Sequence, residues 1–180
     1  KIGMVGRAAV IAKVAERLTH WRLVPLVLDP VMVAKGGDAL LDKSATGALR
    51  EALVPLATIL TPNLPEAGVL LEARPVETVK EMYRAAERLR SLMRDDGARW
   101  VYLKGGHLPG GDATDLLHDG DRMIELKAAR VATSNTHGTG CTYAAAIAAG
   151  LGKGLALRDA VAEAKAFVTR AVTQFLRWAH

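Results

Sequence analysis

The chain has 180 residues, of which 50% are hydrophobic and only 4% aromatic, so its core must consist mainly of aliphatic side chains and alanine. This length is enough for one domain with a sizeable core. Its single cysteine excludes an intramolecular disulfide framework and a cysteine-based zinc cluster. So few cysteines are typical of proteins in a reducing cytosol. No apolar run approaches the ~20 residues needed to cross a bilayer, and no signal peptide is recognisable, so we expect a cytoplasmic protein without a membrane partner.

The 24 basic residues exceed the 19 acidic ones, which gives a formal net charge of +5. Much of the excess is arginine spread along expected helices, as at Arg84, Arg88, Arg90 and Arg94. Nucleic-acid binding requires a clustered basic stripe, preferably with aromatic residues, so we predict a solvated face and no nucleic-acid partner. A positive charge mildly favours anionic substrates such as ATP.

Short apolar runs alternate with stretches of helical spacing through the first hundred residues. Ser44 is the expected N-cap of the second helix in this series. In chain order the expected elements are a strand at residues 1–6, a helix at about 9–18, a strand at 25–28, a helix at 40–53, a strand at 57–60, helices at 65–71 and 76–93, and a strand at 100–103.

The pattern changes after residue 112. Apolar segments at 113–117 and 123–126 flank Asp119-Gly120, a pair typical of a hairpin turn. Helices at 140–151 and 157–178 follow. Strands that alternate with helices predict an α/β fold with a mostly parallel sheet flanked by helices, to which the hairpin adds a late antiparallel edge. No linker or repeat interrupts the chain, so we expect a single domain over residues 1–180.

The loop Thr136-His137-Gly138-Thr139-Gly140-Cys141-Thr142 is followed by small residues that predict a helix packed close to a sheet. A glycine loop that leads into a helix N-terminus exposes unpaired amides, which together with the helix dipole form an anion site. A thiol at Cys141 is expected to lose its proton more easily in this position. A packing junction without ligand is an equally good interpretation of the loop by itself.

Polar residues gather at the expected carboxyl ends of the strands, where open α/β sheets bind ligands. Lys104, before Gly105-Gly106, is placed to reach phosphate oxygens. Asp29 and Glu66 are candidate Mg²⁺ ligands, partly through water. Alternatively, Asp29 begins a simple turn, and Asn63 with Glu66 forms a capping box. Neither a Walker A motif nor a G-x-G-x-x-G motif occurs, which argues against a P-loop or dinucleotide-binding fold.

The segments that hold these residues resemble those of the hydroxymethylpyrimidine/phosphomethylpyrimidine kinases of thiamine biosynthesis, in the ribokinase-like superfamily. The resemblance extends over nearly all of the chain. It rests on Asp29-Pro30-Val31-Met32-Val33-Ala34-Lys35, Thr61-Pro62-Asn63-Leu64-Pro65-Glu66-Ala67, Val101-Tyr102-Leu103-Lys104-Gly105-Gly106-His107 and Asn135-Thr136-His137-Gly138-Thr139-Gly140-Cys141-Thr142.

This resemblance implies a ribokinase-like fold and phosphorylation of the pyrimidine hydroxymethyl group, and then of the monophosphate, with ATP and Mg²⁺. The implied roles are a catalytic anion hole at Gly138, Thr139 and Gly140, with Cys141 as the catalytic residue or as a part of the substrate pocket. They further include nucleotide and phosphate contacts at Asn63, Lys104 and Thr139, metal binding at Asp29 and Glu66, and a pyrimidine pocket at Met4 and Val31. Relatives are commonly dimers, so we expect a homodimer, with residues 113–126 as a candidate surface.

The family carries about 70 further residues before the strand at Lys1, within the size of a single domain. They hold part of the pyrimidine site, so we expect the N-terminal portion to be missing here and the 180-residue chain alone to have little or no kinase activity. Two alternatives stay open. The chain is a pyridoxal or pyridoxine kinase of the same superfamily, or it is a non-catalytic remnant that binds nucleotide.

Overall fold

A mixed five-stranded sheet runs through the protein in the order β1-β2-β3-β4-β5. The computed structural model describes residues 1–21, 25–33, 39–106, 108, 112–132 and 137–175. The strands are β1 (Val27–Leu28), β2 (Ile59–Leu60), β3 (Trp100–Leu103), β4 (Asp112–His118) and β5 (Met123–Ala129).

The first three strands are parallel, and the last two form an antiparallel hairpin on β3. At the hairpin turn, Oδ1 of Asp119 accepts hydrogen bonds from the amides of Asp121 and Arg122, at 2.9 and 2.6 Å. Gly120 has φ +104°, which glycine adopts cheaply. The predicted α/β fold with a late antiparallel hairpin is therefore confirmed, although the hairpin strands are longer than expected.

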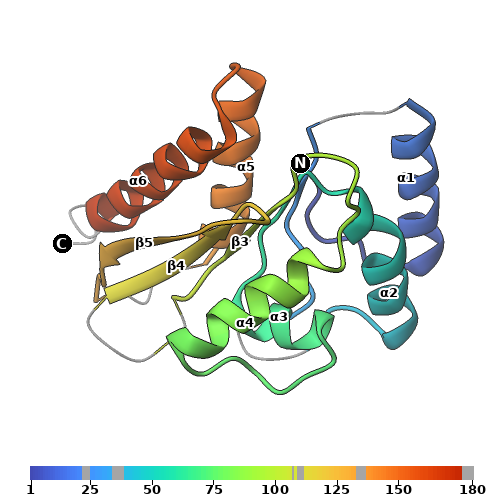
Figure 1. The fold of residues 1–180 in the computed structure, drawn as a ribbon, viewed down its shortest axis with the longest axis horizontal. Helices are drawn as coiled ribbons and strands as arrows, with labels where there is room; N and C mark the ends of the chain where they lie inside the picture. The colour runs from blue at the N-terminus through green and yellow to red at the C-terminus, as the bar shows by residue number, and fades with distance from the viewer. Residues whose placement is uncertain (22–24, 34–38, 107, 109–111, 133–136, 176–180) are drawn as a thin grey trace.

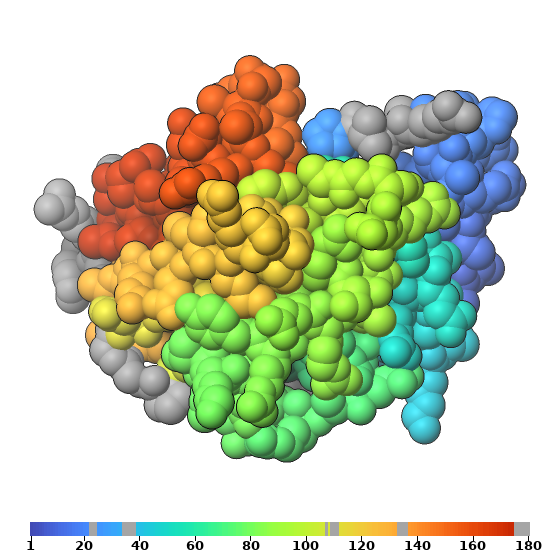
Figure 2. Space-filling model, in the orientation of Figure 1, coloured from blue at the N-terminus to red at the C-terminus, as the bar shows by residue number. Residues whose placement is uncertain are grey.

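Helices cover both faces of this sheet. Helices α5 and α6 lie on one side, and α3 and α4 on the other, with α1 and α2 toward the far end (Figure 1). Their bounds are α1 (Ala8–Trp21), α2 (Lys43–Ala48), α3 (Leu64–Leu70), α4 (Val79–Arg90), α5 (Thr139–Gly152) and α6 (Leu157–Phe175), with a π-helical turn at Leu49–Leu53 and a 3₁₀ turn at Val54–Leu56. In the space-filling view, α5 and α6 form one end of the molecule and α1 the other (Figure 2). No helix in the described ranges is long and apolar enough to cross a membrane.

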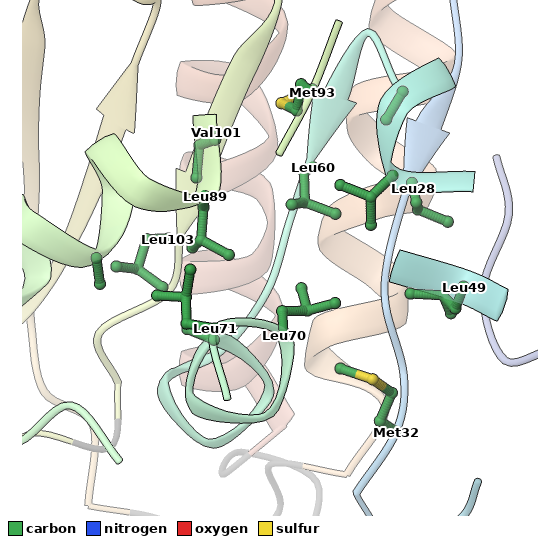
Figure 3. Close-up of a cluster of buried hydrophobic side chains, with 14 of the residues drawn as sticks. Leu28, Met32, Leu49, Leu60, Leu70, Leu71, Leu89, Met93, Val101 and Leu103 are labelled. Carbon is green, nitrogen blue, oxygen red and sulfur yellow. The ribbon is translucent and has the colours of Figure 1, made fainter. Parts of the chain in front are cut away.

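Successive strand residues point to opposite faces, and this alternation divides the core into two clusters. Leu28, Leu60 and Leu103 face α1 to α4, where they pack with residues such as Leu70 and Leu89 (Figure 3). On the other face, Val27, Ile59, Tyr102 and Leu117 pack against α5 and α6. Strands β1 to β3 are therefore buried on both sides, as a three-layer α/β/α fold requires, while β5 is only partly buried.

Two expectations for the first part of the chain were wrong. The strand at residues 1–6 is reduced to one parallel bridge from Ile2 to Leu28, because among the described residues only the amides of Ile2 and Asp29 find partners across this edge. The N-cap of α2 is Asp42 rather than Ser44. Oδ1 of Asp42 accepts the amide of Ala45 at 2.7 Å, while the Ser44 hydroxyl donates to the same oxygen.

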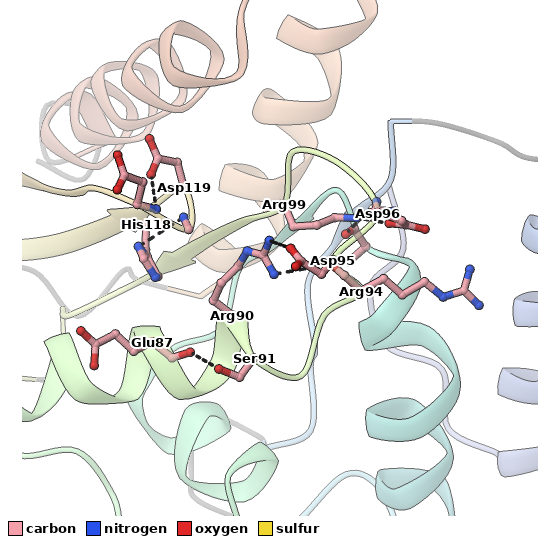
Figure 4. A network of polar contacts seen from close by, with 12 residues as sticks. Glu87, Arg90, Ser91, Arg94, Asp95, Asp96, Arg99, His118 and Asp119 are labelled. Carbon is pink, nitrogen blue, oxygen red and sulfur yellow. Dashed lines mark hydrogen bonds and ion pairs between the residues drawn. The ribbon is translucent and has the colours of Figure 1, made fainter.

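A polar cluster closes the amino ends of β2 and β3, where α4 returns to the sheet (Figure 4). Arg99 donates to the carbonyl of Ala57 at 3.2 Å and pairs with Asp96. Arg90 extends from the end of α4 to Asp95, 3.4 Å away, and its guanidinium lies beside Gly120 of the hairpin turn. This cluster ties the connections together at the edge opposite the carboxyl ends of the parallel strands.

Candidate functional site

The carboxyl ends of β1, β2 and β3 meet at one edge of the sheet, here called the carboxyl edge and defined by Asp29, Asn63 and Lys104. Asp29 directly follows β1, and Lys104 directly follows β3. Asn63 and Lys104 form a parallel bridge beyond the strands, and the amide of Lys104 donates to the carbonyl of Pro62 at 2.9 Å. The parallel register thus brings together side chains that are far apart in the sequence.

Lys104 and Asp29 form an ion pair at this edge, with Nζ of Lys104 3.0 Å from Oδ1 of Asp29. The hydroxyl of Thr61 donates to the same oxygen at 3.2 Å. Asp29 is only 1% exposed, and among the described residues its other oxygen, Oδ2, has no hydrogen-bond partner. A buried carboxylate oxygen without a partner is costly unless a donor or a cation occupies the site when ligand is bound.

Asn63 and Glu66 form the capping box of α3, so this alternative interpretation of the pair is confirmed. The Asn63 side chain accepts the amide of Glu66, and the Glu66 carboxylate accepts the amide of Asn63, each at 2.8 Å. Burial raises the pKa of Glu66 to about 7, with Lys104 acting in the opposite direction and Asp29 adding to the increase. A carboxyl group with a pKa near neutral, beside Lys104 and Asp29, can hold a proton at lower pH or a cation at higher pH.

The glycine loop enters α5 beside Lys104. Gly138 is the N-cap with φ +79°, a left-handed conformation, and no side chain of the described residues caps the helix. A methyl group placed on Gly138 would meet nothing within 4 Å, and one placed on Gly140 would meet only Nζ of Lys104, at 3.2 Å. Close packing of helix on sheet therefore does not explain these glycines, which argues against a mere packing junction. Thr136 lies outside the described residues.

The ammonium of Lys104 and the N-terminus of α5 consequently face the same small space. The backbone amides at a helix N-terminus, the positive end of its dipole and a lysine together form an anion site. The Lys104 side chain is 12% exposed, so water screens its charge only weakly. This arrangement can stabilise the negative charge of a phosphate.

Three other candidate residues, Cys141, Met4 and Val31, remain to be placed. Cys141 is in the first turn of α5 and is exposed. Met4 is 57% exposed, and Val31 is half-buried. None of the three lines the cavity beside the anion site that is described next. Residues 34–38, which follow soon after Val31 in the chain, lie outside the described residues.

A cavity of about 260 Å³ adjoins the anion site, between the sheet and the last two helices. It is called the α6 cavity here. It is lined by the three residues expected from the sequence to contact nucleotide or phosphate, Asn63, Lys104 and Thr139, and by Gly140 of the expected anion hole. Its other walls combine apolar residues of β5 and α6 with two further cations and one carboxylate: Arg130, Lys165 and Asp115. Such a cavity suits a ligand with an apolar part and an anionic part.

Sequence reasoning missed Asp115, Arg130, Tyr143 and Lys165 as wall residues. A signal was present for two of them. Asp115 interrupts an otherwise apolar strand face, and Lys165 lies on the α6 face that also carries Val161, Ala164 and Val168, all of which are buried. Charged residues are almost never buried without a partner, so a charge on an apolar face indicates a buried contact.

The residues of the carboxyl edge fit a hydrated divalent cation. No group of three or more His, Cys, Asp and Glu side chains gathers in the described part of the chain. Asp29 and Glu66 are the carboxylates beside Lys104, and Oδ2 of Asp29, which has no hydrogen-bond partner among the described residues, is a suitable ligand atom. Mg²⁺ retains several waters and needs only one or two carboxylates in addition to phosphate oxygens.

Comparison with known proteins gives the family. The model of the phosphomethylpyrimidine kinase family matches residues 1–180. A hydroxymethylpyrimidine/phosphomethylpyrimidine kinase of Rhizobium meliloti (strain 1021) is 50% identical over 173 residues, which are 96% of this chain and 63% of that protein. The chain thus spans less than two thirds of this relative.

Solved structures agree. A phosphomethylpyrimidine kinase from Clostridium difficile 630 superposes with a TM-score of 0.81 at 34% identity, over 95% of this chain and 67% of the other. Pyridoxal kinase from Staphylococcus aureus, in complex with AMP-PCP, superposes with a TM-score of 0.85 at 37% identity, over 94% of this chain and 60% of the other. The chain belongs to the phosphomethylpyrimidine kinase family, and its fold is ribokinase-like, as the sequence predicted.

Proposed function

We propose that this member of the phosphomethylpyrimidine kinase family contributes the nucleotide- and phosphate-binding part of an ATP-dependent kinase. The acceptor is the hydroxyl of 4-amino-5-hydroxymethyl-2-methylpyrimidine, and then the phosphate of its monophosphate. One observation carries the proposal. The Lys104 ammonium approaches Gly140 at the N-terminus of α5, which places a cation and a set of helix amides around one space.

Phosphoryl transfer depends on positioning and charge stabilisation more than on covalent chemistry by the protein. The α5 N-terminus at Gly138 to Gly140 stabilises the charge on the oxygens of the transferred phosphoryl group. Lys104 is paired with Asp29, and its ammonium has further hydrogens that can be donated to a phosphate. Thr139 and Asn63, which line the α6 cavity with Lys104, complete the phosphate contacts.

Mg²⁺ in this site supplies positive charge that offsets the charge of the phosphates. Oδ2 of Asp29 and the carboxylate of Glu66 are the groups that would hold it, partly through water. The pKa of Glu66, raised to about 7, means that this carboxyl must give up a proton to act as a ligand. Cation binding and proton release at Glu66 are therefore linked.

Cys141 is proposed as the base for the acceptor hydroxyl. Its thiolate takes the hydroxyl proton while the acceptor oxygen bonds to the γ-phosphorus and the bond to the ADP oxygen breaks, so ADP leaves. Met4 and Val31 are proposed to contact the pyrimidine. A homodimer and a cytoplasmic location stay predictions.

Pyridoxal is the second candidate acceptor, because a pyridoxal kinase superposes as well as a pyrimidine kinase does. The pyrimidine is preferred since the 50% identical relative carries that name. A coupled assay of ADP release with hydroxymethylpyrimidine, its monophosphate and pyridoxal distinguishes the two, alongside direct measurement of ATP binding. ADP release with the pyrimidines supports the proposal, and release with pyridoxal alone overturns it. ATP binding without turnover on any acceptor favours the non-catalytic remnant.

A further inference from the structure

A buried carboxylate, Asp115, joins the loop that carries Lys104 to the wall of the α6 cavity. Oδ1 of Asp115 accepts the amide of Gly105 at 2.8 Å. Its Oδ2 accepts both the hydroxyl of Tyr102 and the ammonium of Lys165, each at 2.6 Å. Asp115 is 4% exposed and Lys165 is 7% exposed. One carboxylate therefore holds groups from β3, from the loop after β3 and from α6.

The contact with Gly105 fixes the position of Lys104. Gly105 follows Lys104 directly, and a methyl group on it would lie 1.9 Å from the carbonyl oxygen of Thr114, so the loop touches β4 at van der Waals distance. On its other side the loop is held by Arg130, which donates to the carbonyls of Gly106 and Leu108. The backbone from which the Lys104 side chain extends is thus clamped, with Asp115 supplying the buried anchor.

The contact with Lys165 holds a second ammonium at the cavity. Nζ of Lys165 also donates to the carbonyl of Ala113, at 3.2 Å. Lys165 lines the same cavity as Lys104. Tyr102, which is fully buried, contacts Tyr143 of α5, with ring centroids 5.7 Å apart. Burial and the neighbouring Asp115 raise the pKa of Tyr102, so its hydroxyl remains a donor to the carboxylate.

We propose, on the basis of the proposed function, that Asp115 is a positioning residue for the polyphosphate of the nucleotide. It holds the Lys104 loop and the Lys165 ammonium in place before ligand arrives, so that binding requires little rearrangement of either cation. Fixing charged groups in advance reduces the entropic cost of binding. Asp115 therefore affects binding of the anionic part of the ligand much more than binding of the nucleoside.

The test compares dissociation constants of ATP, inorganic tripolyphosphate and adenosine for the unaltered protein and for Asp115→Asn. Asparagine keeps an oxygen for the Gly105 amide, but its amide hydrogens face Lys165. In Asp115→Asn we expect the dissociation constants of ATP and tripolyphosphate to rise about tenfold or more, which is typical when a residue that orients a binding group is replaced. The dissociation constant of adenosine should rise by less than about threefold. Asp112→Asn, at an exposed carboxylate on the same strand, is the matched control and leaves all three unchanged.

A double variant, Asp115→Asn with Lys165→Met, guards against misfolding because it leaves no buried charge without a partner. It is expected to show the same selective loss. Unchanged binding in both variants, or an equal loss for all three probes, overturns the positioning role. If Asp115→Asn shows the selective loss but no acceptor supports ADP release, the proposed function fails and this inference stands. If the unaltered protein binds none of the probes, both fail.

Discussion

Nζ of Lys104 lies 3.0 Å from Oδ1 of Asp29, although 75 positions separate the two residues in the sequence. The pair is nearly buried, with side-chain exposures of 12% and 1%. Sequence reasoning gave the two residues separate ligands, a phosphate for Lys104 and a metal for Asp29. The structure pairs them with each other, so the group expected to bind phosphate and the group expected to bind metal lie side by side.

Replacement of Lys104 by methionine is expected to destabilise the fold. It leaves the Asp29 carboxylate buried without a cation, and removal of one partner of such a pair costs about 3–5 kcal/mol. Urea unfolding measures the loss. The double variant Lys104→Met with Asp29→Asn removes both charges and should recover most of the stability, while a single-variant loss below about 1 kcal/mol would contradict the importance of the pair.

Glu66 should make stability depend on pH. Its pKa is raised by burial from 4.5 to about 7 in the folded protein, so the folded state binds more protons than the unfolded state between these values. The free energy of unfolding therefore decreases as pH rises from about 4.5 to 7, by roughly 3 kcal/mol in total, and then levels off.

The variant Glu66→Gln isolates this effect, because it keeps an oxygen for the capping box and cannot ionise. It should be more stable than the unaltered protein at pH 8 and about equal to it at pH 5, when both are unfolded in urea. A stability difference that does not change between these two pH values would be inconsistent with the raised pKa.

Replacement of Cys141 by alanine should separate catalysis from binding. If the thiolate accepts the proton of the substrate hydroxyl, turnover falls by about a hundredfold or more, because general bases typically contribute that much. The dissociation constant of ATP stays within about twofold, since Cys141 does not line the α6 cavity. The exposed position means that thermal stability should not change. Unchanged turnover would show that Cys141 is not the general base.

Replacement of Asp42 by alanine should lower the thermal midpoint more than replacement of Ser44. Asp42 caps α2 through the amide of Ala45, whereas Ser44 only donates to the Asp42 carboxylate. The hydrogen bond from the Ala45 amide also lowers the pKa of Asp42. Paired thermal melts of the two variants decide the matter, and an equal or larger effect of Ser44→Ala would show that the cap is assigned to the wrong residue.

Local sequence pattern determined most of the fold. The Asp-Gly turn of the hairpin, the strand at Trp100–Leu103 and the helix after Gly138 all follow from residues near one another in the chain. The pattern failed at residues 1–6 and at Ser44, where the outcome depends on which partner is available across the sheet edge and on which of two neighbouring oxygens reaches an amide.

The glycine loop, the capping box of Asn63 and Glu66, and the placement of Asp29 and Lys104 at strand ends could be predicted from the sequence, because each is set by short spacing or by the direction of parallel strands. Only the tertiary structure decided that Lys104 pairs with Asp29 and that Asp115 joins Gly105 to Lys165. These contacts join residues from different elements. Their geometry is determined by how the strands align and how α5 and α6 pack on the sheet. The spacing of neighbouring residues in the sequence does not predict either of these.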